Sequence, residues 1–125
     1  MVQQLFVVGL GGALGAMARY GLSGWVQRQA GTFPLGTMVV NVVGCLILGA
    51  MMTLVEDRPA LSPNTRLFVG IGLLGSFTTF STFGFETFEL LREREHWLAL
   101  ASVAGNLGIG LAAVVLGRTI IRAAF

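Results

Sequence analysis

The residues with the most unusual chemistry lie between Gly75 and Phe83, where three phenylalanines at a spacing of three are interleaved with five hydroxyl side chains. An aromatic ring carries partial positive charge at its edge. The edges of Phe80 and Phe83, with the hydroxyls of Ser81 and Thr82, therefore suit an anion path without a fixed positive charge. Such a path favours a small, tightly hydrated ion, which a lysine would trap. Phenylalanines at this spacing are also common in ordinary helix packing, and the sequence leaves both interpretations open.

The same segment is expected to interrupt its helix. Glycines at 70, 72 and 75, followed by clustered serine and threonine, weaken a regular helix. A break frees backbone carbonyls, which at membrane depth are good ligands for cations. Such a break is tolerated only where it is buried in protein or lines a cavity.

Three further polar side chains lie in apolar surroundings. Asn41 is flanked by valines and offers two amide hydrogens. These could bind a bare anion, or Asn41 could join two helices through an amide hydrogen bond. Ser102 and Asn106 are four residues apart and share a helix face, so they either continue a polar track or only pack.

Two charged residues lie within or at the end of apolar stretches. Arg19 is roughly 21 Å along a helix from Leu5, at 1.5 Å per residue. At that depth its side chain either concentrates anions at a pore mouth or contacts lipid phosphate at the interface. Glu86 follows the hydroxyl-rich segment, where it either caps the polar track near Ser102 or is a solvated helix end.

Composition argues strongly against a soluble enzyme. Hydrophobic residues make up 54% of the 125 residues and charged residues 11%, against about 25% charged in an ordinary globular domain. Mean hydropathy is +0.80, which favours an integral membrane protein. The net charge of +2 is too small to indicate a nucleic-acid partner. One cysteine, Cys45, excludes an intrachain disulfide, and no set of catalytic side chains is recognisable, so we expect no enzyme.

Four apolar stretches are long enough to cross a bilayer as helices, which takes about 20 residues each. The run Glu56–Pro59 ends the second, Ser62 and Pro63 match the start of the third, and the charged run Arg92–His96 precedes the fourth. We expect an all-α integral membrane protein with one domain, residues 1–125. Its expected transmembrane helices, the third broken within the membrane, cover about residues 5–26, 36–55, 65–92 and 97–120.

Positive charge is almost evenly divided between the two sides of the membrane. The side with both termini carries Arg58, Arg66, Arg118 and Arg122, and the other carries Arg28, Arg92 and Arg94. Arginine and lysine in short loops set orientation. The near balance suggests that copies insert in both orientations and pair antiparallel, although a weak bias with one orientation is equally compatible.

Small residues recur every four positions in two stretches. Gly11 and Gly15 do so in the first, and Ala104, Gly108 and Ala112 in the fourth. Such stripes allow close helix contact. The contact is either within one chain or between two copies.

Taken together, these features resemble the small fluoride channels called Fluc or CrcB proteins, over nearly the whole chain. The segments that match the family's motifs are Gly11–Ala16 with Arg19-Tyr20, Pro34–Thr37 with Val40-Asn41 and Gly44, and Gly75 with Thr78–Phe83. The third motif is highly specific.

The resemblance implies a dual-topology antiparallel homodimer in the inner membrane of a bacterial cell, with two fluoride pores along the subunit interface. It also implies a structural sodium ion that is not transported, held at the break by the backbone carbonyls of Gly75 and Thr78. The partners implied are fluoride, a second copy and membrane lipid. The implied function is passive export of fluoride that enters as neutral HF and is trapped inside as the anion.

The residues and the resemblance together give the expected ion pathway: Asn41, Phe80, Phe83, Ser81, Thr82, Arg19, Glu86, Ser102 and Asn106. By motif position, Arg19 resembles the family's vestibule arginine, and Phe80 and Phe83 its two path-lining rings. The fourth helix matches less well. Asn106 and Gly110 stand where some members carry other small polar or imidazole side chains.

Two other functions are compatible with the sequence. A small multidrug-resistance-type, proton-coupled exporter also has four helices and often dual topology. Its mechanism needs a carboxylate inside the membrane, whereas the first stretch has no acid and Glu86 lies at a helix end. A non-transporting assembly subunit would use the polar residues for packing only.

Overall fold

The chain is an all-helical, multi-pass membrane protein. The computed structural model describes residues 1–58 and 60–125; Pro59, expected to help end the second stretch, lies outside the described residues. Four helical segments are long and apolar enough to cross a membrane: Val2–Gln27, Leu35–Asp57, Pro63–Arg92 and His96–Ala124. The predicted all-α fold with four membrane-spanning helices is therefore confirmed.

The first two spans are single helices and the last two are composite. The elements are α1 (Val2–Gln27), α2 (Leu35–Asp57), α3 (Pro63–Arg66), η1 (Leu67–Leu74), α4 (Gly75–Phe77), α5 (Phe80–Arg92), α6 (His96–Val103), η2 (Ala104–Ile109) and α7 (Gly110–Ala124). The segments η1 and η2 are π-helical, a geometry that is rare and is often found at functional sites.

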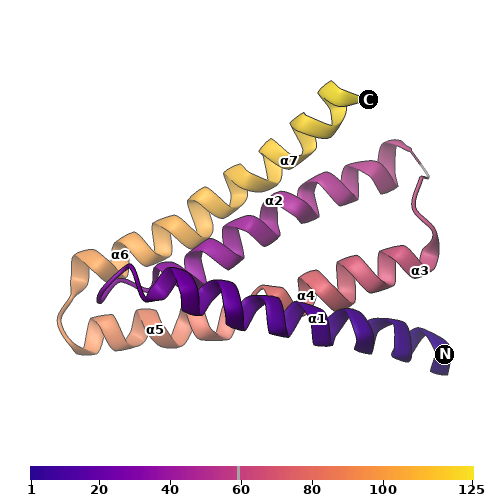
Figure 1. The fold of residues 1–125 in the computed structure, drawn as a ribbon. Helices are drawn as coiled ribbons and strands as arrows, with labels where there is room; N and C mark the ends of the chain where they lie inside the picture. The colour runs from indigo at the N-terminus through magenta and orange to yellow at the C-terminus, as the bar shows by residue number, and fades with distance from the viewer. Residues whose placement is uncertain (59) are drawn as a thin grey trace.

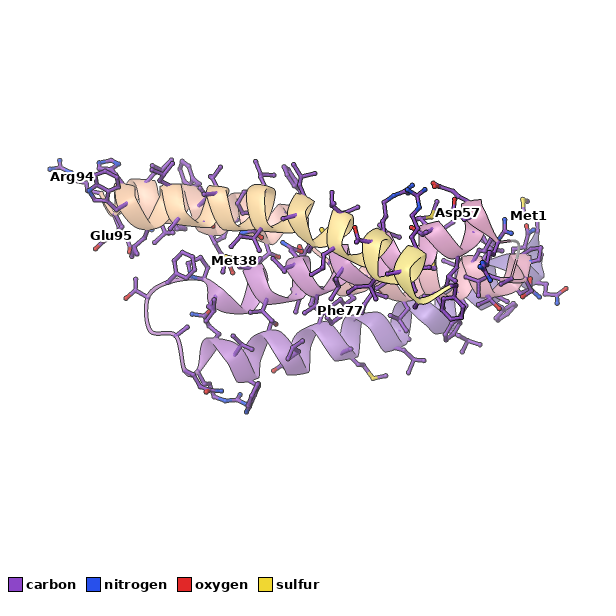
Figure 2. The ribbon with its side chains drawn as sticks, turned by 90° about the horizontal axis from the view of Figure 1, so that it is seen from above. Met1, Met38, Asp57, Phe77, Arg94 and Glu95 are labelled. Carbon is purple, nitrogen blue, oxygen red and sulfur yellow. The ribbon has the colours of Figure 1, made fainter. Side chains whose placement is uncertain are left out.

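The helices form an elongated bundle in which α2 lies beside α7, and α1 lies along η1 and α4 (Figure 1). Both chain ends, the end of α2 and the start of α3 lie at one end of the bundle. The connections from α1 to α2 and from α5 to α6 lie at the other. Figure 2 agrees, with Met1 and Asp57 at one end and Arg94 and Glu95 at the opposite end.

Local signals explain where the third span begins. The Ser62 hydroxyl accepts a hydrogen bond from the Thr65 amide at 3.2 Å, and Pro63 occupies the first helical position. The serine side chain satisfies one backbone N–H group that has no acceptor within the helix. The proline has no N–H group that would need an acceptor. Ser62 and Pro63 therefore start the helix as the sequence predicts.

Glycine allows the close approach of α1 to η1. A Cβ atom on Gly11 or Gly15 would overlap the carbonyl oxygens of Phe68 and Leu73. The first small-residue stripe therefore packs within the chain. The second stripe, Ala104, Gly108 and Ala112, is exposed along the fourth span.

Much of the apolar surface is not covered by this chain. Phe6, Ile71 and Leu111 are 61–70% exposed, as expected for helices that face lipid or another subunit. Charged side chains gather at the end that holds the termini, where Arg118 pairs with Glu56 at 2.9 Å. The long apolar sides and charged ends match a chain that spans a bilayer.

Candidate functional site

The third span changes backbone geometry between α4 and α5. Thr78 (φ −88°, ψ 159°) and Thr79 (φ −151°, ψ 115°) are extended. Asn41 on α2 holds this segment at two points. Its Oδ1 accepts a hydrogen bond from the Thr79 amide at 2.8 Å, and its Nδ2 donates to the Thr79 carbonyl at 3.0 Å. One amide side chain thus replaces the helical bonding that Thr79 lacks.

Gly75 and Thr78 are among the residues whose carbonyl oxygens lose their usual helical donors at this point. In an α-helix, each carbonyl accepts from the amide four residues later. The Thr79 amide instead bonds to Asn41, so Gly75 loses its donor. The Thr82 amide bonds to the Thr79 hydroxyl at 3.2 Å, so Thr78 loses its donor too. Backbone oxygens freed in this way are the type that binds sodium in membrane proteins.

These two residues fit a cation site made from the backbone rather than from acidic side chains. Among residues 1–58 and 60–125, no cluster of histidine, cysteine, aspartate or glutamate could hold a metal ion. Gly75 and Thr78 both line a cavity of about 290 Å³. The same cavity is lined by Asn41, Phe80, Phe83 and Asn106.

The two phenylalanines stand edge to face beside this cavity. Their ring centroids are 5.6 Å apart, with an interplanar angle of 71°. Phe83 is buried at 7% exposure, whereas Phe80 is 77% exposed. In this arrangement the positive edge of one ring meets the negative face of the other. Most of the Phe80 side chain is not covered by this chain.

A chain of polar side chains leads from the cavity into the bundle. Asn41 Nδ2 donates to Asn106 Oδ1 at 2.8 Å, and Asn106 Nδ2 donates to the Ser102 carbonyl at 2.9 Å. The Ser102 and Thr87 hydroxyls are 3.2 Å apart. Ser102 is fully buried and Asn106 is 9% exposed. The structure therefore joins Asn41, Asn106 and Ser102 in one network, with Thr87 as an additional member.

Glu86 lies in a different contact from the one expected near Ser102. The Thr37 hydroxyl donates to Glu86 Oε1 at 2.8 Å. Glu86 Oε2 is buried and has no hydrogen-bond partner among the described residues. The Ser102 hydroxyl meets Thr87 instead, one position along α5, so Glu86 does not cap that part of the track.

The remaining candidates surround the extended segment. The Thr79 hydroxyl lies 3.0 Å from the Thr82 hydroxyl and 3.5 Å from that of Ser81, which is exposed. Arg19 Nε donates to the Ser76 carbonyl at 2.9 Å. Arg19 is therefore hydrogen-bonded to the third span at the end of α4.

Comparison with known proteins shows the family. The family described as "CrcB-like protein, Camphor Resistance (CrcB)" matches residues 6–118. The chain belongs to the CrcB family. It is 51% identical over 118 residues to a protein of Nitratidesulfovibrio vulgaris named fluoride-specific ion channel FluC, covering 93% of this chain and 94% of that relative.

Other CrcB relatives carry the same type of name. Fluoride-specific ion channel FluC 1 of Methanosarcina acetivorans is 44% identical over 114 residues, covering 91% of this chain and 87% of the relative. FluC of Chloroflexus aurantiacus is 42% identical over 117 residues, covering 93% of each. The CrcB family is one of ion channels and not of enzymes.

Sequence reasoning missed two polar residues: Thr87, which belongs to the Asn41 network, and Thr37, which bonds to Glu86. Thr37 precedes Asn41 by four residues, a spacing that places both on one face of α2, and this signal was available. Thr87 had no comparable signal, because its role depends on α6 packing beside α5. The roles of all these residues in ion movement stay predictions.

Proposed function

We propose that this chain is a fluoride-selective channel that lets fluoride leave the cell passively across the cytoplasmic membrane. The observation that carries the proposal is the Asn41 clamp on Thr79. It holds an interruption of a membrane span open beside a cavity lined by Phe80 and Phe83. The names of the relatives indicate which anion this arrangement serves.

The chemistry offered to the anion is a series of weak donors. Both Nδ2 hydrogens of Asn41 are already donated, to the Thr79 carbonyl and to Asn106. Hydroxyl groups can reorient to suit a ligand, so Ser102, Thr87 and Ser81 are the more adaptable donors. Phenylalanine edges add positive potential without a mobile or fixed cation. Fluoride can then exchange water for these groups and still leave.

We further propose that two copies form an antiparallel, dual-topology homodimer with two pores along the interface. Phe80 is 77% exposed beside the cavity, and a second copy would cover it. The near balance of arginines at the two ends supports insertion in both orientations. The interruption would then lie near the middle of the membrane, where lipid alone does not tolerate it.

The antiparallel arrangement also accommodates a central, non-transported sodium ion. Selective cation sites made of backbone carbonyls use oxygens from several segments. Gly75 and Thr78 of one chain supply two oxygens, and the second copy would supply the others. When bound, the ion would add fixed positive charge that lowers the cost of bringing an anion nearby.

The test is anion release from proteoliposomes that hold the purified protein. We expect rapid release of fluoride and almost no release of chloride under the same gradient. Liposomes without protein are the control for passive leakage. Equal release of both halides, or no release of either, would refute the proposal, and the second outcome would favour an assembly subunit.

A further inference from the structure

The side chain of Arg19 is bound to the third span. Its Nε donates to the Ser76 carbonyl at 2.9 Å, in a partly buried contact between residues 57 apart in sequence. Among the described residues, no carboxylate forms an ion pair with it. The guanidinium thus forms a hydrogen bond with a backbone oxygen and no ion pair with an acidic side chain of the described residues.

That oxygen belongs to the end of a helix. The run from Pro63 to Phe77 is continuously helical, and Thr78 and Thr79 are then extended. The last four carbonyls of a helix lack helical donors. A cation at this end also meets the negative end of the helix dipole. Arg19 therefore supplies both a missing donor and a favourable charge.

The glycine stripe of α1 explains how Arg19 reaches this position. Gly11, Gly15 and Arg19 are four residues apart and share one helix face. Because the two glycines lie against the η1 backbone, Arg19 falls beside the end of α4. The Ser76 hydroxyl, which has one hydrogen to donate, lies 2.8 Å from the Gly12 carbonyl of α1 and 2.7 Å from the Gly72 carbonyl of its own span. The first helix thus holds Ser76 by its carbonyl, and its Gly12 carbonyl lies within hydrogen-bond distance of the Ser76 hydroxyl.

We propose that Arg19 is a positioning residue: it pins the carbonyl end of α4 and so fixes the interruption beside which the anion passes. Two clamps hold the interruption, with Arg19 of α1 on Ser76 and Asn41 of α2 on Thr79. Each clamped residue is the sequence neighbour of a freed carbonyl, Ser76 of Gly75 and Thr79 of Thr78. The effect on transport rests on the proposed channel function, whereas the hold on the backbone does not.

Arg19→Lys separates this role from anion attraction. Lysine keeps the positive charge, but in the same rotamer its Cε methylene group takes the place of Nε and offers no donor there. An attracting charge would be preserved by the substitution, and a pin would be lost. Arg28→Lys is the matched control, because Arg28 lies on an exposed part of the chain near the same end of α1.

Two measurements on the full chain decide the proposal. The first is hydrogen exchange, in lipid nanodiscs, of peptides that cover residues 75–83. Loss of a charge-assisted hydrogen bond should raise their exchange at least about tenfold in Arg19→Lys. The second is the ratio of fluoride to chloride release from liposomes, which should fall by a similar factor. Arg28→Lys should match the wild type in both.

Each outcome supports or overturns the proposal. Exchange within about twofold of the wild type overturns it. Faster exchange with an unchanged halide ratio also overturns it, because Arg19 would then be structural only. If Arg19→Lys does not yield folded protein, Arg19→Gln is measured in the same way. A wild-type protein that passes no fluoride refutes the channel function, and the exchange data then still decide whether Arg19 holds the interruption.

Discussion

Replacing Asn41 with leucine tests whether the clamp on Thr79 is needed for transport. Leucine has a similar size but removes three hydrogen bonds: those to the Thr79 amide, to the Thr79 carbonyl and to Asn106. Side-chain hydrogen bonds inside membrane proteins average about 0.6 kcal/mol each. The three together give about 2 kcal/mol, or a roughly 25-fold loss in the population of the held conformation.

We therefore expect fluoride release by Asn41→Leu liposomes to fall roughly 25-fold relative to the wild type. Thr53→Val is the matched control. Thr53 is 1% exposed on the same helix, and its hydroxyl bonds to the Gly49 carbonyl of the preceding turn, at 2.9 Å. This variant should release fluoride at close to the wild-type rate. An Asn41→Leu protein that elutes like the wild type and conducts within twofold of it would refute the reasoning.

Three further predictions concern the rings, the helix contact and the topology. Phe80→Ile or Phe83→Ile should reduce fluoride release while the size of the purified assembly is unchanged, since isoleucine lacks the positive ring edge. Unchanged release in both variants would show that the rings serve only in packing. Gly15→Ala should destabilise the protein by about 1–3 kcal/mol in a denaturant titration, because its Cβ would overlap the Leu73 carbonyl, whereas Gly9→Ala enters open space and should not. A tag on Phe125 should be found on both sides of the membrane, and its detection on one side only would reject dual topology.

The helices were predictable because hydrophobic composition is a property of each stretch of sequence and does not depend on tertiary contacts. Long uncharged stretches separated by the charged runs at Glu56 and at Arg92 are sufficient to define four spans. The cap at Ser62 and the proline after it are also local, and they match the structure. The π-helical geometry of η1 and η2 was not predicted, since glycines at 70, 72, 105 and 108 do not distinguish it from an ordinary helix with poor propensity.

The candidate site was predictable as a set of residues but not as a set of contacts. The hydroxyl-rich segment and Asn41 were each singled out by their unusual position in apolar sequence. That Asn41 bonds to Thr79, 38 residues away, depends on the rotation of α2 against the third span, which no local pattern specifies. The same holds for Thr37 and Glu86, whose pairing spans 49 residues. Tertiary packing, not sequence chemistry, determines these partners.

The contacts around Thr78 and Thr79 explain how two extended residues can persist between α4 and α5. Buried backbone groups without partners are costly, and in lipid no water replaces them. Asn41 satisfies both backbone groups of Thr79, the Thr79 hydroxyl satisfies the Thr82 amide, and Arg19 satisfies the Ser76 carbonyl. Each contact restores a bond that the extended backbone removes. The carbonyls of Gly75 and Thr78 lose their helical donors, no side chain of the described residues donates to them, and both residues line the cavity. The extended residues are thus held by side chains from α1 and α2 and by the Thr79 hydroxyl, while the carbonyls of Gly75 and Thr78 keep no helical donor.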